Sequence, residues 1–183
     1  MPNFFRFVLL AAFIAAPALA QEGPRAELFG GYEYLHLNPG GASCHGVGTN
    51  LAYNLNSWLG AVGDFGVCKE TGGSTFHDVN YLFGPRVSYR SSSYGKVTPF
   101  AEVLFGGQHA AGSNLAFNSF AMTLGGGADY RYNQHISFRG QAEYLYTHFG
   151  GTRQNNARIE AGIVYRWGAF SQPFHRKKKA QKR

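Results

Sequence analysis

The sequence of 183 residues has a formal net charge of +7, from 17 lysines and arginines against 10 acidic residues. The excess lies near the two ends, because removing Arg6 and the six basic residues of the last eight positions leaves 10 basic and 10 acidic residues. A neutral body argues against a folded nucleic-acid-binding domain, which needs a basic face. The 25 glycines, the 16% of aromatic residues and the lack of 3.6-residue periodicity argue against a helical bundle or coiled coil.

The first 20 residues have the composition of an export signal. Arg6 gives a positive start, residues 7–16 form a short apolar stretch, and residues 18–20 read Ala-Leu-Ala, a small-residue cleavage site. We therefore predict a signal peptide over 1–20 and a short mature N-terminal segment over 21–25. Export would place the two cysteines in an oxidising compartment.

Over residues 26–170, segments in which apolar and polar residues alternate with a period of two are separated by turn residues, which predicts an all-β fold. The gaps are short at 56–57, 91–95 and 133–135, and longer at 38–46, 68–75, 108–118 and 148–156. An even number of strands with short turns at one end and longer loops at the other is typical of an antiparallel up-and-down transmembrane β-barrel. The eight expected strands cover residues 26–37, 47–55, 58–67, 76–90, 96–107, 119–132, 136–147 and 157–167.

Each expected strand has one apolar face and one face that carries charge. Val79 and Phe83, for example, alternate with Asp78 and Arg86. The apolar faces lack charge and end in aromatic rings, which favours lipid outside and charges inside. A soluble lipocalin-like barrel, with its apolar side inward, is the alternative.

Eight strands enclose a lumen just wide enough to be filled by side chains. We therefore expect the charged faces to form a plug of ion pairs, because an unpaired charge in such a space is costly. The residues of this expected network are Glu27, Glu33, Asp64, Asp78, Arg86, Arg90, Glu102, Asp129, Arg131, Arg139, Glu143, Arg158, Glu160 and Arg166.

Several sequence stretches occur in a characteristic order over residues 26–168. They include Glu27-Leu-Phe-Gly-Gly-Tyr32, Leu82-Phe-Gly-Pro-Arg-Val-Ser-Tyr-Arg90 and Ala161-Gly-Ile-Val-Tyr-Arg-Trp-Gly168. In this order they resemble the small OmpA-like outer membrane β-barrel proteins of bacteria. The resemblance implies an integral protein of the bacterial outer membrane, surrounded by its lipid, with both ends of the barrel chain in the periplasm. It also implies that the barrel-assembly machinery reads the last strand at Tyr165 and Trp167.

The two cysteines are expected to form a disulfide between the first and second external loops. The register of the two strands that flank the hairpin at Asn56-Ser57 decides how close the cysteines lie. If the numbers of paired residues sum to 112, Cys44 lies directly opposite Cys68. If they sum to 114, the two cysteines are diagonal neighbours. Free thiols are one alternative, and a metal site that adds His45 and His77 is another.

Few residues have the types and spacing of a catalytic site, so we predict neither enzyme activity nor a cofactor. His77 and Asp78 are adjacent in a strand and therefore point to opposite faces, so they cannot form a base and its orienting acid; Ser43 and Ser74 are the candidate nucleophiles. Residues 125–127, three glycines, lie inside a strand, where close packing or bending explains them.

Residues 171–183 form a basic tail without apolar periodicity, which we expect to be disordered in the periplasm. Its cations would allow attachment to anionic lipid or cell-wall polymer. The sequence as a whole predicts a structural envelope protein. A narrow porin-like channel, and a surface adhesin or recognition barrel that acts through its external loops, remain open as alternatives.

Overall fold

The computed structural model describes residues 23–38, 41–70, 77–90, 96–112, 115–149 and 152–169. The expected signal peptide and the basic tail lie outside these residues. Within the described ranges, the structure contains no helix long and apolar enough to cross a membrane.

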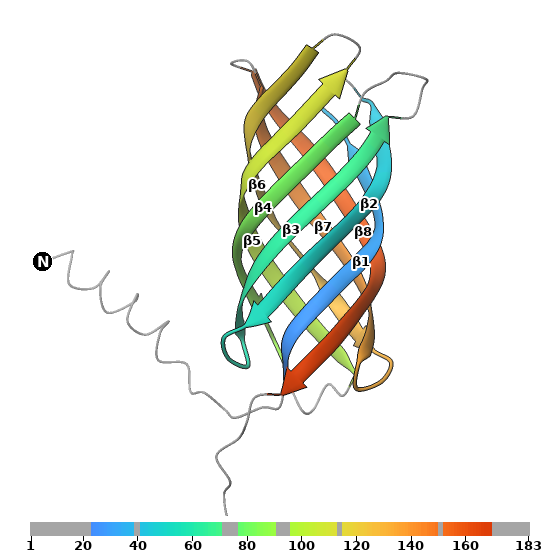
Figure 1. Ribbon diagram of the computed structural model, residues 1–183, viewed down its shortest axis with the longest axis vertical. Coiled ribbons are helices and arrows are strands. Elements are labelled where there is room, and N and C mark those ends of the chain that lie inside the picture. The colour runs from blue at the N-terminus through green and yellow to red at the C-terminus, as the bar shows by residue number, and fades with distance from the viewer. Residues whose placement is uncertain are drawn as a thin grey trace, which may run out of the picture.

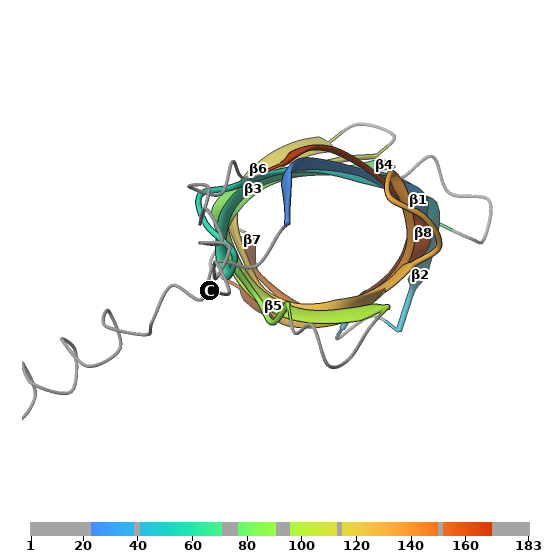
Figure 2. The same cartoon turned by 90° about the horizontal axis from the view of Figure 1, so that it is seen from below.

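Eight antiparallel strands form one closed barrel, as the sequence predicts (Figure 1). The ring closes because β1 pairs with β8 along its length, with Phe29 opposite Val164 (Figure 2). The strands are β1 (Pro24–His36), β2 (Ser43–Asn54), β3 (Leu59–Glu70), β4 (His77–Ser88), β5 (Val97–Gly112), β6 (Leu115–Arg131), β7 (Ile136–Phe149) and β8 (Thr152–Ala169).

The two ends of the barrel differ in their connections. At one end, here the turn end, β1 begins, β8 finishes and the connections 55–58, 89–96 and 132–135 lie. The other end, here the loop end, carries the connections 37–42, 71–76, 113–114 and 150–151. In Figure 1 the turn end is the lower one.

Two loops expected from the sequence are mostly strand in the structure. Residues 108–118 and 148–156 were predicted as loops because Gly, Ala, Asn and Ser are frequent there, but β5 and β6 stay paired up to Gly112 and Leu115. In the same way β7 and β8 stay paired up to Phe149 and Thr152. The neighbouring strand satisfies the backbone hydrogen bonds whatever the side chains prefer, so pairing overrides the local turn signal.

The alternation of faces is as predicted, with apolar side chains outside and charges inside. Phe83 is 64% exposed, whereas Asp78 and Asn80 on the same strand are fully buried. Among the described side chains of β2–β8, Lys69 and Arg153 are the charged ones on outward positions, and both lie at the loop end. The soluble alternative, with charges outward, is therefore wrong.

Aromatic residues form two girdles on the outer surface, one near each end, as bilayer interfaces favour. The turn-end girdle includes Tyr53, Tyr89, Tyr130, Tyr165 and Trp167, and the loop-end girdle includes Tyr32, Phe120 and Tyr144.

We expect spin labels at Phe83 and Ile163 to be relaxed by oxygen dissolved in lipid and protected from a water-soluble nickel chelate. A label at the buried Ser137 provides the inward control and should be protected from both reagents. Efficient relaxation of the Phe83 and Ile163 labels by the nickel chelate, in reconstituted vesicles, would contradict the lipid-facing assignment.

Candidate functional site

Two arginine–carboxylate pairs join neighbouring strands in the turn-end half of the lumen. Arg139 donates from Nε to Asp129 Oδ1 at 2.6 Å and from Nη2 to Asp129 Oδ2 at 2.8 Å. Arg86 donates from Nε to Glu102 Oε2 at 2.6 Å. Both pairs consist of residues directly opposite each other on paired strands. The strand register thus places each guanidinium beside its carboxylate.

Glu27 on β1 links this half of the lumen across the barrel. Its Oε1 accepts a hydrogen bond from Arg90 Nη2 at 2.8 Å and one from Asn54 Nδ2 at 3.1 Å. Its Oε2 accepts one from Arg139 Nη2, on the non-neighbouring strand β7, at 3.1 Å. The hydrogen bonds therefore cross the lumen as well as following its wall.

An aromatic ring lies between two of these cations. Phe100 faces the lumen and is 7% exposed. The guanidinium carbons of Arg86 and Arg139 lie 4.5 Å and 4.6 Å from the centre of its ring. Because the face of an aromatic ring attracts cations, Phe100 helps to hold two like charges close together.

Arg158 on β8 is the central group of the loop-end half and is 1% exposed. Its Nε donates to Glu143 Oε2 at 2.7 Å. Its Nη1 donates to Asp64 Oδ1 at 2.8 Å and to Asn80 Oδ1 at 3.0 Å, and these acceptors belong to β3 and β4. One guanidinium therefore connects four strands.

Two further carboxylates share the same guanidinium. Glu33 Oε2 lies 3.7 Å from Arg158 Nη1, and Glu160 Oε2 lies 4.0 Å from Arg158 Nε. Glu33 and Glu160 are opposite each other in the β1–β8 register. Gly48 and Gly66 make room for them, since a Cβ at either position would overlap a carboxylate oxygen. Glycine at these inward positions thus permits long acidic side chains.

Formal charge is unevenly distributed along the lumen. The turn-end half contains four arginines and three carboxylates: Arg86, Arg90, Arg139 and Arg166, with Glu27, Glu102 and Asp129. The loop-end half contains one arginine and five carboxylates: Arg158, with Glu33, Asp64, Asp78, Glu143 and Glu160. Asp78 accepts a hydrogen bond from Gln108. The loop-end half is therefore acidic and the turn-end half slightly basic.

Buried side chains from every strand fill the middle of the lumen. Each strand contributes at least one inward side chain that is no more than 3% exposed, and a continuous water-filled path would expose some of them. These side chains include Glu33, Asn50, Asp64, Leu82, Leu104, Thr123, Leu145 and Arg158.

Buried leucines also fill the lumen, although the sequence alone did not lead us to assign them there. Leu82 lies two residues after Asn80, and Leu104 two residues after Glu102, so both share the parity of inward polar residues. Because residues two positions apart on a strand point to the same face, the sequence could have assigned these leucines to the lumen. Apolar side chains are tolerated inside because they fill space between the polar clusters without needing partners.

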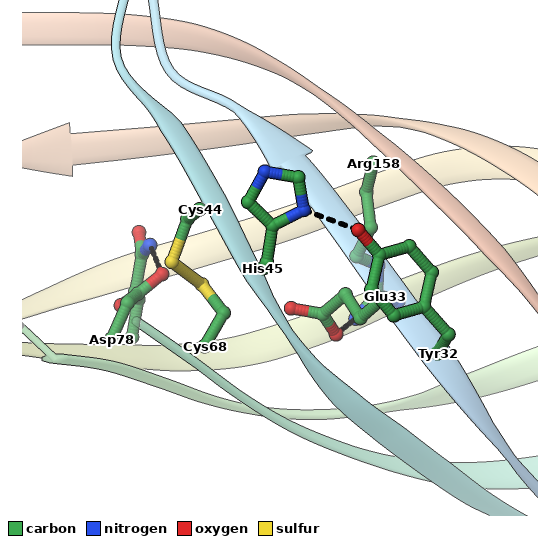
Figure 3. The surroundings of a disulfide bond; sticks show 8 residues. Tyr32, Glu33, Cys44, His45, Cys68, Asp78 and Arg158 are labelled. Carbon is green, nitrogen blue, oxygen red and sulfur yellow. Dashed lines mark hydrogen bonds and ion pairs between the residues drawn. A yellow bond between two sulfur atoms is a disulfide. The ribbon is translucent and has the colours of Figure 1, made fainter. Parts of the chain in front are cut away.

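The predicted disulfide between Cys44 and Cys68 is present (Figure 3). The pairing numbers of β2 and β3 sum to 114, so the two cysteines are diagonal neighbours, with Gly46 opposite Cys68. Both side chains are buried and face inward. The expectation that the bond joins two external loops was wrong, because β2 and β3 extend past the cysteines.

Comparison with known proteins places this geometry in a family. Residues 7–166 match the family described as "Outer membrane protein beta-barrel domain". The chain belongs to this family. No curated protein matches the sequence.

Solved structures with the same fold are small outer membrane barrels. Neisserial surface protein A (NspA) is 12% identical, with a TM-score of 0.69 over 80% of this chain and 99% of that one. The N-terminal β-barrel domain of Pseudomonas aeruginosa OprF is 11% identical, with a TM-score of 0.56 over 78% and 99%. Ail, the attachment invasion locus protein of Yersinia pestis, solved with a heparin analogue, is 17% identical, with a TM-score of 0.53 over 79% and 98%. The protein is therefore an outer membrane β-barrel of this type.

Arg131 is the residue of the expected network that the structure does not bring into the buried lumen. It is exposed at the end of β6, one inward position beyond Asp129. It therefore shares the inward face of the strand but lies past the last buried layer. Arg166 is buried, and its Nη2 donates to the backbone oxygen of Asn133 at 2.9 Å.

The candidate catalytic and metal residues of the barrel do not come together. His77 is exposed on the outer face, and Asp78 is buried inside. Ser43 pairs with the Tyr34 hydroxyl, and Ser74 lies outside the described residues. A metal site built on the two cysteines is excluded by their disulfide.

Replacement of Arg158 by Gln should lower the free energy of unfolding by about 3–5 kcal/mol, because several buried carboxylates lose their shared partner. Urea unfolding in detergent micelles measures the change. Arg153→Gln, at an exposed position of the same strand, is the matched control and should leave the midpoint unchanged. Equal midpoints for the two variants would contradict a stabilising role of the Arg158 cluster.

Replacement of both cysteines by alanine should lower the free energy of unfolding by about 2–4 kcal/mol, because the bond constrains a segment of the unfolded chain. Its sequence separation is 24 residues. The wild-type barrel, denatured without reductant, should take up no alkylating reagent at Cys44 or Cys68. Two alkylated thiols in the mass spectrum would show that the bond is absent.

Proposed function

We propose that this outer membrane barrel has a structural role in the envelope and that its lumen is a closed plug of ion pairs. The observation that supports the proposal most directly is the layer of buried side chains contributed by all eight strands. Such a layer leaves no room for the hydrated solutes that a porin passes.

The contacts within the plug favour a rigid closure. Arg158 and Arg139 each bond partners on non-neighbouring strands, at distances of 2.8 Å and 3.1 Å respectively. Opening a path at either level would separate buried charges from their partners, which is costly in a medium of low dielectric constant. The network thus opposes a solute path through the lumen.

The absence of a catalytic role is part of the same proposal. The histidine and aspartate that are adjacent in sequence lie on opposite faces of β4, so neither orients the other. Every buried carboxylate of the described lumen except Asp78 lies within 4.0 Å of a guanidinium nitrogen, and Asp78 accepts a hydrogen bond from Gln108, which explains these carboxylates without acid–base chemistry. At 17% identity, the likeness to Ail shows the fold alone, so an attachment role is not carried over.

In planar lipid bilayers we expect the purified barrel to show no steady opening of porin size. A general porin inserted in the same bilayer controls for the recording, and heat-modifiable mobility on gels controls for folding. Rare and small current events fit transient rearrangement of the plug. A stable large conductance would overturn the closed-lumen proposal and favour the channel.

A further inference from the structure

The mouth of the barrel at its turn end contains a cavity that the structural role does not use. Its volume is about 730 Å³, within the range of small-molecule sites. Its lining includes Lys96 from the 89–96 turn, Arg131 from the end of β6 and Arg166 from β8. No aspartate or glutamate is among the described residues that line it. The cavity is therefore surrounded by positive charge.

Arg166 supplies a second and independent indication of a ligand. It is only 7% exposed, and its Nε, which carries a hydrogen, has no hydrogen-bond partner among the described residues. A buried guanidinium N–H without an acceptor is costly, so an acceptor from outside the chain would stabilise it.

The nearby carboxylates already have other arginine partners. Asp129 accepts two hydrogen bonds from Arg139, and Glu27 accepts bonds from Arg90 and Arg139. No ion pair of Arg166 is found within the described part of the chain. The basic excess of the turn-end half is thus concentrated at the mouth.

The chemistry of the lining fits a phosphate group better than a carboxylate. A phosphate carries up to two negative charges and three acceptor oxygens, which matches several cations around one cavity. The guanidinium fork is also complementary to phosphate geometry. Tyr132 and Trp167 are also among the residues that line the cavity.

We propose that the turn-end mouth is a phosphate-binding site in which Arg166 is the buried anchor and Lys96 and Arg131 add positive charge. The phosphate comes either from a soluble phosphate compound or from the headgroup of an anionic lipid. Both sources present the same oxygens to Arg166, and they differ in whether the group is tethered to the membrane.

The test uses the full chain extracted from outer membranes in dodecylmaltoside, a detergent without phosphate. Inorganic pyrophosphate is titrated at constant ionic strength, and binding is followed by calorimetry and by the Nε–H resonance of Arg166. In a parallel arm, phosphatidylglycerol in the micelles replaces pyrophosphate, with phosphatidylcholine as the zwitterionic comparison. Saturable binding in one arm assigns the source, and binding in both indicates a site open to either.

Arg166→Gln should weaken the binding about tenfold or more, as expected for loss of a charge-assisted hydrogen bond. Arg153→Gln, at the opposite end of the same strand, should bind like wild type, which controls for general attraction of anions. Lys96→Gln, in an exposed turn, should give a smaller loss and keeps the test valid should Arg166→Gln not fold. Absence of saturable binding in both arms would overturn the proposal. Equal affinities of the wild type and a folded Arg166→Gln variant would also overturn it. If Arg166→Gln does not fold, equal affinities of the wild type and Lys96→Gln would have the same consequence.

Discussion

A strand that crosses a bilayer must find partners within the protein for its backbone N–H and C=O groups, because the hydrocarbon offers none. The pairing of β1 with β8 meets this requirement by joining the first and last strands into a ring. Closure then leaves only two directions for side chains, toward lipid and toward the lumen. The sorting of apolar and charged residues follows from this constraint, since charges on the lipid face of a membrane barrel are destabilising.

Closure also places charged side chains where water does not reach them, so each needs a partner inside. Arg86 and Glu102 meet this need through the register of neighbouring strands, and their pairing requires only β4 and β5. Arg158 differs, because Asp64 reaches it from across the lumen. Such contacts form only when the whole ring is closed. The stability of the loop-end half is therefore coupled to all the strands between its partners.

The sequence carried enough information for the strand number, the faces and the cysteine pair, because all three depend on a period of two. It did not determine the strand ends, since the residues of 108–118 resemble turn residues and their pairing depends on the neighbouring strand. It could not distinguish pairing sums of 112 and 114 between β2 and β3, because both preserve the same faces. The partners of Arg158 across the lumen depend on the stagger of the closed ring, which no single strand encodes. The buried leucines could have been assigned from parity, as Leu104 shows beside Glu102.

The two halves of the lumen have opposite charge excess, and buried side chains such as Asn50, which accepts hydrogen bonds from Arg86 and Arg139, lie between the charged groups. Glu33 and Glu160 share Arg158 in the loop-end half, whereas Arg166 lines the cavity at the turn-end mouth. Under the closed-lumen proposal, a solute at the turn end meets cations and does not reach the acidic half. Under the same proposal, recognition of a solute is confined to the mouths, where exposed groups remain. The ion pairs inside the barrel hold together the strands that form those mouths.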